Sequence, residues 1–386
     1  MYFSISQIKN GGIIMGNTNS KAPFRYDTVG SFLRPEALKD ARSKYTAGDI
    51  SKEELQEVED QAIITLIEKQ KAAGLLAVTD GEFRRRWWHL DFIAGLNGIT
   101  VYDFQTTAFG ITTNAQGTYV SGPLSFSRNH PFLDHFRFTQ KHASPTLAKQ
   151  TIPGPNMIFL DSLILSKQYH ENPVYLSLET FKIDLINTYQ DIIQAFYDAG
   201  CRYLQLDDTS WGGLFDERFR KLIQANGLDA DQLLTDFQEV TEKSLENKPD
   251  DLVVTFHFCK GNFQSHWLYN GTYETIAQNL FSITAFDGFF LEYDDERSGG
   301  FEPLKELKDQ RVVLGLITTK NGELEDPLVI EKRIKEASKF VPLDQICLSP
   351  QCGFASTQEG NHLTEEDQWK KIKLVETIAK NVWHDA

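Results

Sequence analysis

The chain has 386 residues, of which 41% are hydrophobic, and a formal net charge of -15. This length and apolar content are enough for one large domain or two medium ones. The acidic balance argues against a nucleic-acid groove, because binding phosphates requires clustered Lys and Arg. Apolar runs fall short of the roughly 18 residues that a membrane span needs, and four cysteines in so long a chain do not form a disulfide framework. We therefore expect a cytoplasmic protein without a nucleic-acid or membrane partner.

The first segment, residues 1–24, mixes a short apolar stretch with Gly and Asn and lacks strong periodicity. We expect it to be a disordered or non-native extension. The stretch before Met15 resembles a translated ribosome-binding site, so a start at Met1 or at Met15 stays open. A start at Met15 would expose Met-Gly-Asn-Thr-Asn-Ser, which resembles a myristoylation signal, although chance matches to that pattern are common.

Strand and helix patterns then alternate along the chain. Amphipathic segments at helical spacing include Leu178–Ala199, which closes on Gly200, and Pro327–Phe340, which Asp326 can cap. The candidate strands are short apolar runs at Asp27–Phe32, Leu75–Asp80, Gln150–Pro153, Tyr203–Asp207, Leu252–Phe258, Phe289–Glu292, Val312–Ile317 and Ile346–Leu348.

Eight apolar strands separated by helices predict a parallel sheet buried on both faces. The number favours a single (β/α)8 TIM barrel over residues 25–386 rather than an open doubly wound sheet. The first strand is not followed by a glycine-rich dinucleotide fingerprint. Residues 98–126 are rich in Thr, Gly, Tyr and Phe, and they predict a β-hairpin excursion at the barrel mouth.

Four potential metal ligands lie at the carboxyl ends of predicted strands: His257, Cys259, Glu292 and Cys352. Residues two apart on a strand face the same side, so His257 and Cys259 can both point inward. This end of a barrel carries the active site in enzymes of this fold. Zinc binds Cys, His and carboxylate side chains, and it can hold a substrate thiol as the reactive thiolate. The set predicts a zinc site for alkyl transfer to sulfur.

Each of these residues also has a simpler explanation. A Cys at the end of a buried strand is more often a packing residue than a ligand, and we expect Cys201 and Cys347 to be packing residues. A His beside a Phe-rich strand is usually a hydrogen-bonded core residue. Three further acids, Asp294, Asp295 and Glu296, follow Glu292 closely and could replace it.

From about Tyr26 onward, the sequence resembles the catalytic C-terminal barrel of cobalamin-independent methionine synthases. The family's zinc pattern of His-x-Cys, a Glu ending the next strand and a late Cys-Gly is matched by His257, Cys259, Glu292 and Cys352. Uroporphyrinogen decarboxylases share this superfamily fold but lack the zinc ligands. The resemblance implies a zinc-dependent methyltransferase that converts homocysteine to methionine.

The resemblance also implies an acceptor site. The family's Ile-Gly-Ser, which binds the homocysteine carboxylate, looks like Val29-Gly30-Ser31. Its Gly-Glu is similar to Gly81-Glu82, and its Asp after the fourth strand is similar to Asp207. Two carboxylates can hold an ammonium group by charge-assisted hydrogen bonds. If the resemblance is set aside, the simpler interpretation is that Glu82 and Asp207 cap the ends of strands.

Two departures leave the methyl donor open. The family's full-length enzymes have two barrels, whereas this chain has the length of one. The family's proton-donating His after the seventh strand is replaced here by Lys320, which can be a proton donor if its pKa is depressed, or a counter-charge for an anionic substrate.

Aromatic and basic residues after the second strand are candidates for the donor side. Arg84, Trp87 and Trp88 could receive a flat anionic substrate by ion pairing and stacking, or they could simply open a helix with solvated arginines. Trp211 predicts a second, flexible aromatic loop at the same rim.

We thus expect small-molecule partners, namely homocysteine and a methyl donor such as 5-methyltetrahydrofolate, and Zn²⁺ as the cofactor. The alternatives are zinc-dependent alkyl transfer with another thiol or donor, such as a methylcorrinoid or sulfonium compound, and a non-catalytic zinc-binding protein. A homo-oligomer stays open.

Overall fold

Strands and covering helices alternate along the computed structural model, which describes residues 21–108 and 111–386. The strands are β1 (Ala77–Val78), β2 (Asn97–Ala108), β3 (Ile111–Ser125), β4 (Leu147–Ala148), β5 (Gln150–Pro153), β6 (Tyr203–Asp208), β7 (Val253–Phe258), β8 (Gly288–Glu292), β9 (Arg311–Ile317) and β10 (Ile346–Pro350). The α-helices are α1 (Glu36–Ala47), α2 (Lys52–Ala72), α3 (Leu90–Ile93), α4 (Pro131–Ala143), α5 (Asn156–Phe159), α6 (Lys167–Glu171), α7 (Leu178–Asp198), α8 (Gly212–Phe215), α9 (Glu217–Ala225), α10 (Ala230–Leu245), α11 (Ala277–Phe281), α12 (Pro327–Ala337) and α13 (Glu365–Val382). A π-helical turn, η1 (Leu160–Leu165), continues α5, and single 3-10 turns lie at Tyr273–Thr275, Glu296–Ser298, Glu302–Glu306 and Leu343–Gln345.

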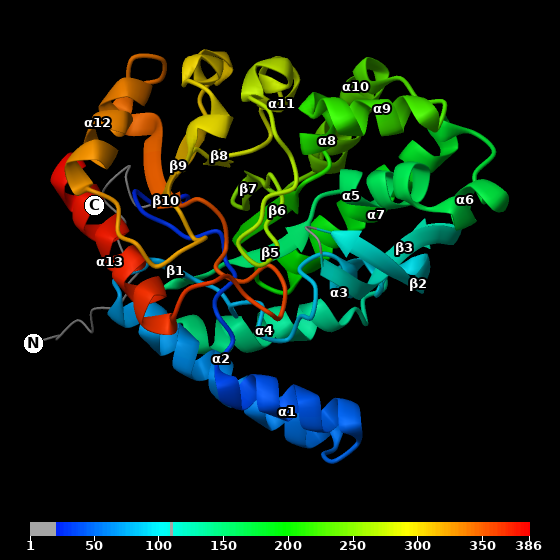
Figure 1. Cartoon of the computed structure of the whole chain (residues 1–386), viewed down its shortest axis with the longest axis horizontal. Coiled ribbons are helices and arrows are strands. Elements are labelled where there is room, and N and C mark those ends of the chain that lie inside the picture. Colours follow the sequence, from blue (N-terminus) through cyan, green and yellow to red (C-terminus); the bar gives the residue numbers. More distant parts are fainter. Residues whose placement is uncertain (1–20, 109–110) are drawn as a thin grey trace, which may run out of the picture.

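The central sheet is parallel and lies inside a ring of helices (Figure 1). Its six hydrogen-bonded strands follow the order β10-β9-β8-β7-β6-β5, and β1 pairs separately with β4. This is an α/β fold of the TIM-barrel family. Because all these pairings are parallel, the carboxyl ends of β6 to β10 meet at one edge of the sheet.

The expected first strand, Asp27–Phe32, is the main difference from the predicted barrel. It is not a regular strand, although Tyr26 makes a parallel bridge with Leu348 of β10. Side chains take the place of a neighbouring strand: Lys149 binds the Thr28 carbonyl at 2.6 Å, Gln205 the Val29 carbonyl at 2.7 Å and Thr79 the Gly30 carbonyl at 2.6 Å. The strand ladder is therefore interrupted between β10 and β1.

The long helices begin where the sequence offers caps. Ser51 and Glu54 form a reciprocal capping box at the start of α2, and Asp326 caps α12, with Pro327 in its first turn. Helix α7 covers almost the predicted range and is followed by Gly200 at φ +98°, a conformation that favours glycine. Helix α12 ends at Ala337, three residues before the predicted limit.

The predicted hairpin is present as β2 and β3, which pair antiparallel from Asn97 to Ser125. Its β3 strand is fixed to the body of the protein, because Ser162 of η1 accepts a bond from the Val120 N–H at 3.2 Å. The Tyr175 hydroxyl accepts a second bond, from the Leu124 N–H at 2.9 Å. The hairpin lies beside α5, α6 and α7 in Figure 1.

Most of the predicted N-terminal extension, residues 1–20, lies outside the described part of the chain. Ala22 and Phe24 are buried against Tyr203 and Val253, so the packed part of the chain begins before residue 25. Every helix in the described part of the chain is too short or too polar to cross a bilayer.

Candidate metal centre and acceptor pocket

The four predicted ligands converge at the carboxyl edge of the sheet. His257 is in β7, Cys259 follows that strand, Glu292 ends β8, and Cys352 follows β10. All four are buried, and their ligand atoms lie within 4.8 Å of one another. The sulfurs of Cys259 and Cys352 are 3.7 Å apart, and the Cys352 sulfur is 3.5 Å from Nε2 of His257.

The spacing of the two sulfurs fits one tetrahedral zinc ion. Zinc–sulfur bonds of about 2.3 Å at a tetrahedral angle separate two sulfur ligands by roughly 3.8 Å. The observed spacing of 3.7 Å is close to this value. Two sulfurs, one imidazole and one carboxylate are also a ligand set that zinc accepts. The site is therefore suited to a single divalent metal.

Outer hydrogen bonds orient the ligands. The Phe290 carbonyl lies 3.3 Å from Nδ1 of His257, so that Nε2 is directed toward Cys352. The Lys260 backbone N–H donates to Oε1 of Glu292 at 3.0 Å, and the Gln351 amide donates to Oε2 at 3.2 Å. Sequence analysis missed Lys260 and Gln351, although both are direct neighbours of predicted ligands.

The pKa values of the four side chains are shifted by their contacts with one another. The hydrogen bond between the two cysteines holds the pKa of Cys352 well below its ordinary value and that of Cys259 well above it. Burial opposes a charge on His257, but its bond to Cys352 prevails and raises its pKa to about 9.

The acids that could have replaced Glu292 are engaged elsewhere. Asp294 forms an ion pair with Lys320 at 2.8 Å, and Asp295 pairs with Arg297. Glu296 begins a 3-10 turn outside the cluster. The structure therefore favours Glu292 as the carboxylate ligand.

A small cavity of about 20 Å³ adjoins the cysteines. It is lined by Val29, Ser31, Glu82, Trp88, Asp207, His257, Cys259, Cys352, Gly353 and Ser356. The predicted acceptor residues Ser31, Glu82 and Asp207 are thus brought together beside the metal ligands. Gly30 is not in the lining, but its φ of +143° and a Cβ position only 2.7 Å from Thr151 Cγ2 explain the glycine before Ser31.

Two carboxyl groups line the cavity, and one of them, Glu82, forms a buried ion pair with Arg85 at 3.3 Å. Glu82 has a positive φ of 62°, which is rare for a residue with a side chain and is typical of strained functional positions. One of its oxygens accepts a bond from Thr151 at 3.0 Å, and the other is buried without a partner among the described residues. Burial raises the pKa of Glu82, and it raises that of Asp207 to about 7. An ammonium group bound here would offset this cost of burial.

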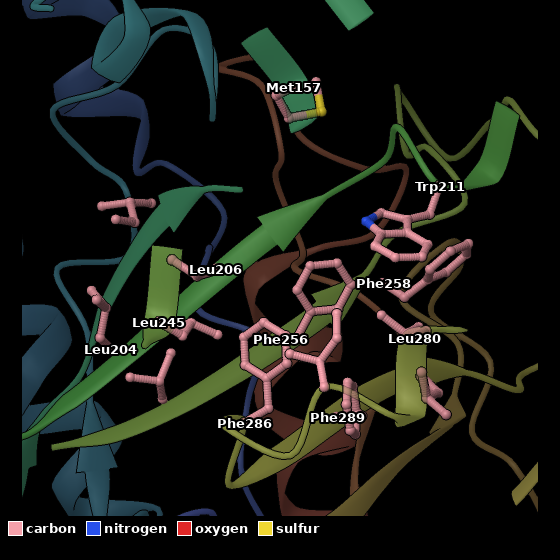
Figure 2. Close-up of a cluster of buried hydrophobic side chains, with 14 of the residues drawn as sticks. Met157, Leu204, Leu206, Trp211, Leu245, Phe256, Phe258, Leu280, Phe286 and Phe289 are labelled. Atoms are coloured by element: carbon pink, nitrogen blue, oxygen red, sulfur yellow. The ribbon is translucent and has the colours of Figure 1, made fainter. Parts of the chain in front are cut away.

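Of the four residues proposed for the donor side, two are engaged elsewhere in the structure and two lie near the cavity. Arg84 is engaged with Glu59 and Asp60 of α2 rather than free to bind an anion. Trp211 is fully buried against Phe237 and Phe256, so it belongs to the core and not to a flexible loop (Figure 2). Both expectations are corrected by packing that a local sequence pattern does not reveal.

Trp87 and Trp88 do lie near the cavity. Trp88 is part of its lining, and the ring of Trp87 is nearly parallel to that of Phe263, at 10° with 6.3 Å between centroids. Ser356, which sequence analysis missed, also lines the cavity, with its hydroxyl 3.9 Å from the Cys352 sulfur. Its sequence position near Cys352 is the one signal that could have suggested it.

Fold and site together define an α/β protein of the TIM-barrel family with a buried His/Cys/Glu/Cys group that could bind a metal ion at the carboxyl edge of its sheet. Residues 24–368 match the family described as cobalamin-independent synthase, catalytic domain. The chain belongs to this family, as the resemblance had predicted.

Individual relatives agree with this assignment. The chain is 48% identical over 367 residues to the uncharacterized protein YxjG of Bacillus subtilis (strain 168), covering 94% of this chain and 96% of the relative. It is 24% identical to a methionine synthase of Sulfurisphaera tokodaii, with 84% of each chain covered. A crystal structure of a proposed vitamin-B12-independent methionine synthase from Listeria monocytogenes is 39% identical, with a TM-score of 0.75, and covers 94% of this chain and 98% of its own.

Proposed function

We propose that the chain is a zinc-dependent methyltransferase that forms methionine from homocysteine. The observation that carries the proposal is the grouping of four zinc-type ligands next to a cavity with two carboxylates and a serine hydroxyl. Family membership and the name of the archaeal methionine synthase support it. We also propose that the strand ladder, although interrupted, works as one closed (β/α)8 barrel over residues 25–386.

The cavity residues orient the acceptor. Glu82 and Asp207 receive the ammonium group, while Ser31 and the backbone after Gly30 receive the carboxylate. This places the thiol of the acceptor toward Cys259 and Cys352. When zinc is bound, its positive charge keeps that thiol ionised at neutral pH. Holding the sulfur in a fixed position next to the donor supplies much of the rate.

Lys320 fits a counter-charge better than a proton donor. Burial opposes its charge, but Asp294 and Glu292 prevail and raise its pKa above the ordinary value. A lysine that holds its proton this tightly gives it up poorly at neutral pH. We propose that Lys320 stabilises the negative charge near Glu292, and that 5-methyltetrahydrofolate, with Trp87 and Trp88 on its side of the site, is the donor to test first.

The test is a methyl-transfer assay with zinc-loaded protein, homocysteine and folate donors that carry one or several glutamates. We expect methionine to form, and Cys352→Ser to lose both stoichiometric zinc and turnover, because the site loses a thiolate ligand. Cys347→Ser is the matched control, since Cys347 is buried in a separate core cluster. A Cys352→Ser protein with full zinc and full turnover would contradict the proposal.

Assays on the same protein also distinguish the two alternative functions. If methylcorrinoid or sulfonium compounds alone donate the methyl group, the zinc–sulfur chemistry stands and the folate donor is wrong. If homocysteine fails to change the spectrum of the cobalt-substituted protein, a non-catalytic zinc-binding role is favoured.

A further inference from the structure

Two loop segments meet above the acceptor cavity. We define the first arm as Arg86–Trp88, after β1, and the second arm as Ser356–Gln358, after β10. The Trp88 N–H donates to the Ser356 carbonyl at 3.2 Å, and the Gln358 N–H donates to the Arg86 carbonyl at 3.0 Å. Trp87 and Thr357 therefore face each other as an antiparallel bridge.

The roots of both arms are fixed independently of this contact. The buried Arg34 guanidinium donates to the Ala355 carbonyl at the root of the second arm and to the Glu82 carbonyl, at 2.9 Å, below the first. Arg85 is also buried and donates to the Thr151 carbonyl at 2.7 Å. Asp91 accepts a bond from the Trp87 N–H at 2.6 Å and so keeps the first arm in shape.

The cavity beside the joined arms is small. To hold a single water molecule, a cavity needs about 10–15 Å³ of space that the centre of a water-sized sphere can occupy. The cavity of about 20 Å³ is therefore close to the size of one water, whereas homocysteine is several times larger. Its deep walls are strand-end residues such as Asp207 and His257, while Trp88 and Ser356 come from the arms.

We propose that the two arms form a clasp that separates to admit the acceptor and rejoins over it, with Trp88 limiting the size of the group beside the metal. The identity of the acceptor rests on the proposed function; the opening itself does not. The two arms are joined to each other by two backbone hydrogen bonds, and Trp87 of the first arm also stacks on Phe263, which belongs to neither arm. Rejoining the arms removes water from the reacting sulfur.

The first experiment locks the clasp. The hydrogen bonds on either side make Trp87 and Thr357 a non-hydrogen-bonded pair, for which the Cα atoms are about 4.5 Å apart, within the range of about 4.4–6.8 Å that a disulfide spans. In the zinc-loaded Trp87→Cys/Thr357→Cys protein, we expect oxidation to weaken homocysteine binding at least about tenfold and reduction to restore it. The reduced form of the same chain controls for the substitutions themselves. Equal binding by the cross-linked and reduced forms would overturn the proposal.

The second experiment does not depend on the acceptor. After zinc removal, iodoacetamide should label Cys259 and Cys352 several-fold faster in Trp87→Ala than in the unmodified protein, because one contact between the clasp and its surroundings is lost. Trp267→Ala is the matched control, since that ring contacts Arg297 and does not line the cavity. Cys201 and Cys347, both fully buried, report any global unfolding by their own labelling.

Equal labelling rates in Trp87→Ala and Trp267→Ala would contradict the clasp. If Trp87→Ala alone labels faster but homocysteine binds to none of the proteins, the proposed acceptor is wrong and the clasp stands. The two proposals therefore fail in distinguishable ways.

Discussion

Asp207 illustrates how single residues are held in place at the proposed acceptor site. Its Oδ1 accepts a bond from Gln205 at 2.7 Å, and the same Gln205 amide holds the Val29 carbonyl next to Ser31. Gln205 thus couples the residues proposed for the ammonium and carboxylate ends of the ligand. Because burial raises the pKa of Asp207 to about 7, its charge changes in the physiological pH range.

This pKa predicts how product binding depends on pH. Methionine is the better probe, because its thioether does not titrate and its ammonium group prefers the ionised carboxylate. We expect methionine binding to be strongest above pH 7 and to weaken as the pH falls through about 7, by up to about tenfold per pH unit. Asp207→Asn should bind more weakly at pH 8 and lose this pH dependence. Calorimetric titration at several pH values measures both effects, and an unchanged pH profile in the variant would assign the titration to another group.

At this scale, the sequence identified residues whose chemistry is unusual for a buried strand end. The four candidate metal ligands, which the structure brings together, and the proposed acceptor residues, which line one cavity, were singled out because Cys, His and carboxylates stand out at such positions. Gln351 and Ser356 were missed because their roles depend on how loops fold back over the site. The partners of Arg84 were missed for the same reason: Glu59 and Asp60 contact it from α2 but lie 25 and 24 residues earlier in the sequence.

At the scale of elements, Gly315 of β9 lets two neighbouring segments approach closely. A Cβ at this position would lie 2.6 Å from the Gln351 Cα and 3.0 Å from the Leu291 carbonyl oxygen. Both contacts are with backbone, so a side-chain rotation cannot relieve them. Gln351 in turn holds Glu292, which links the packing of β9 to the metal ligand.

We therefore predict that Gly315→Ala destabilises the fold by about 1–3 kcal/mol, the usual cost of overpacking, and also weakens zinc binding. Gly122→Ala in β3 is the matched control, because its Cβ would meet Gly98 Cα at an ordinary 3.4 Å. Urea unfolding and competition with a zinc indicator measure the two effects. Similar stability of the two variants would show that the β9 region shifts to accept the methyl group.

Most strands and long helices could be predicted because apolar runs and caps act locally. Strand β5 has the predicted limits, and β6 to β10 differ by one or two residues at their ends. The expected strand Asp27–Phe32 failed because its apolar pattern does not show which groups bind its carbonyls. Three polar side chains from other strand regions, Lys149, Gln205 and Thr79, take that role.

At the scale of the whole molecule, the metal ligands join three parts of the chain that meet at one edge of the sheet. A metal that binds the folded state and not the unfolded one stabilises the fold by mass action. We expect chelation to lower the melting temperature by several degrees in the unmodified protein. Cys352→Ser should already melt near the chelated value and change little on chelation, whereas Cys347→Ser should keep the difference. Calorimetric scans with and without chelator provide the measurement, and identical melting with and without metal would argue against tight binding in the native state.

The position of Cys352 also determines when the site can mature during synthesis. His257, Cys259 and Glu292 leave the ribosome first, but the second sulfur, that of Cys352, follows only after β10. A nascent chain that stops before this point has an incomplete ligand set, however well its earlier strands have folded. Loading with metal would therefore require a chain that has been synthesised past Cys352, and a product that stops earlier would be recognisable by its failure to retain the ion.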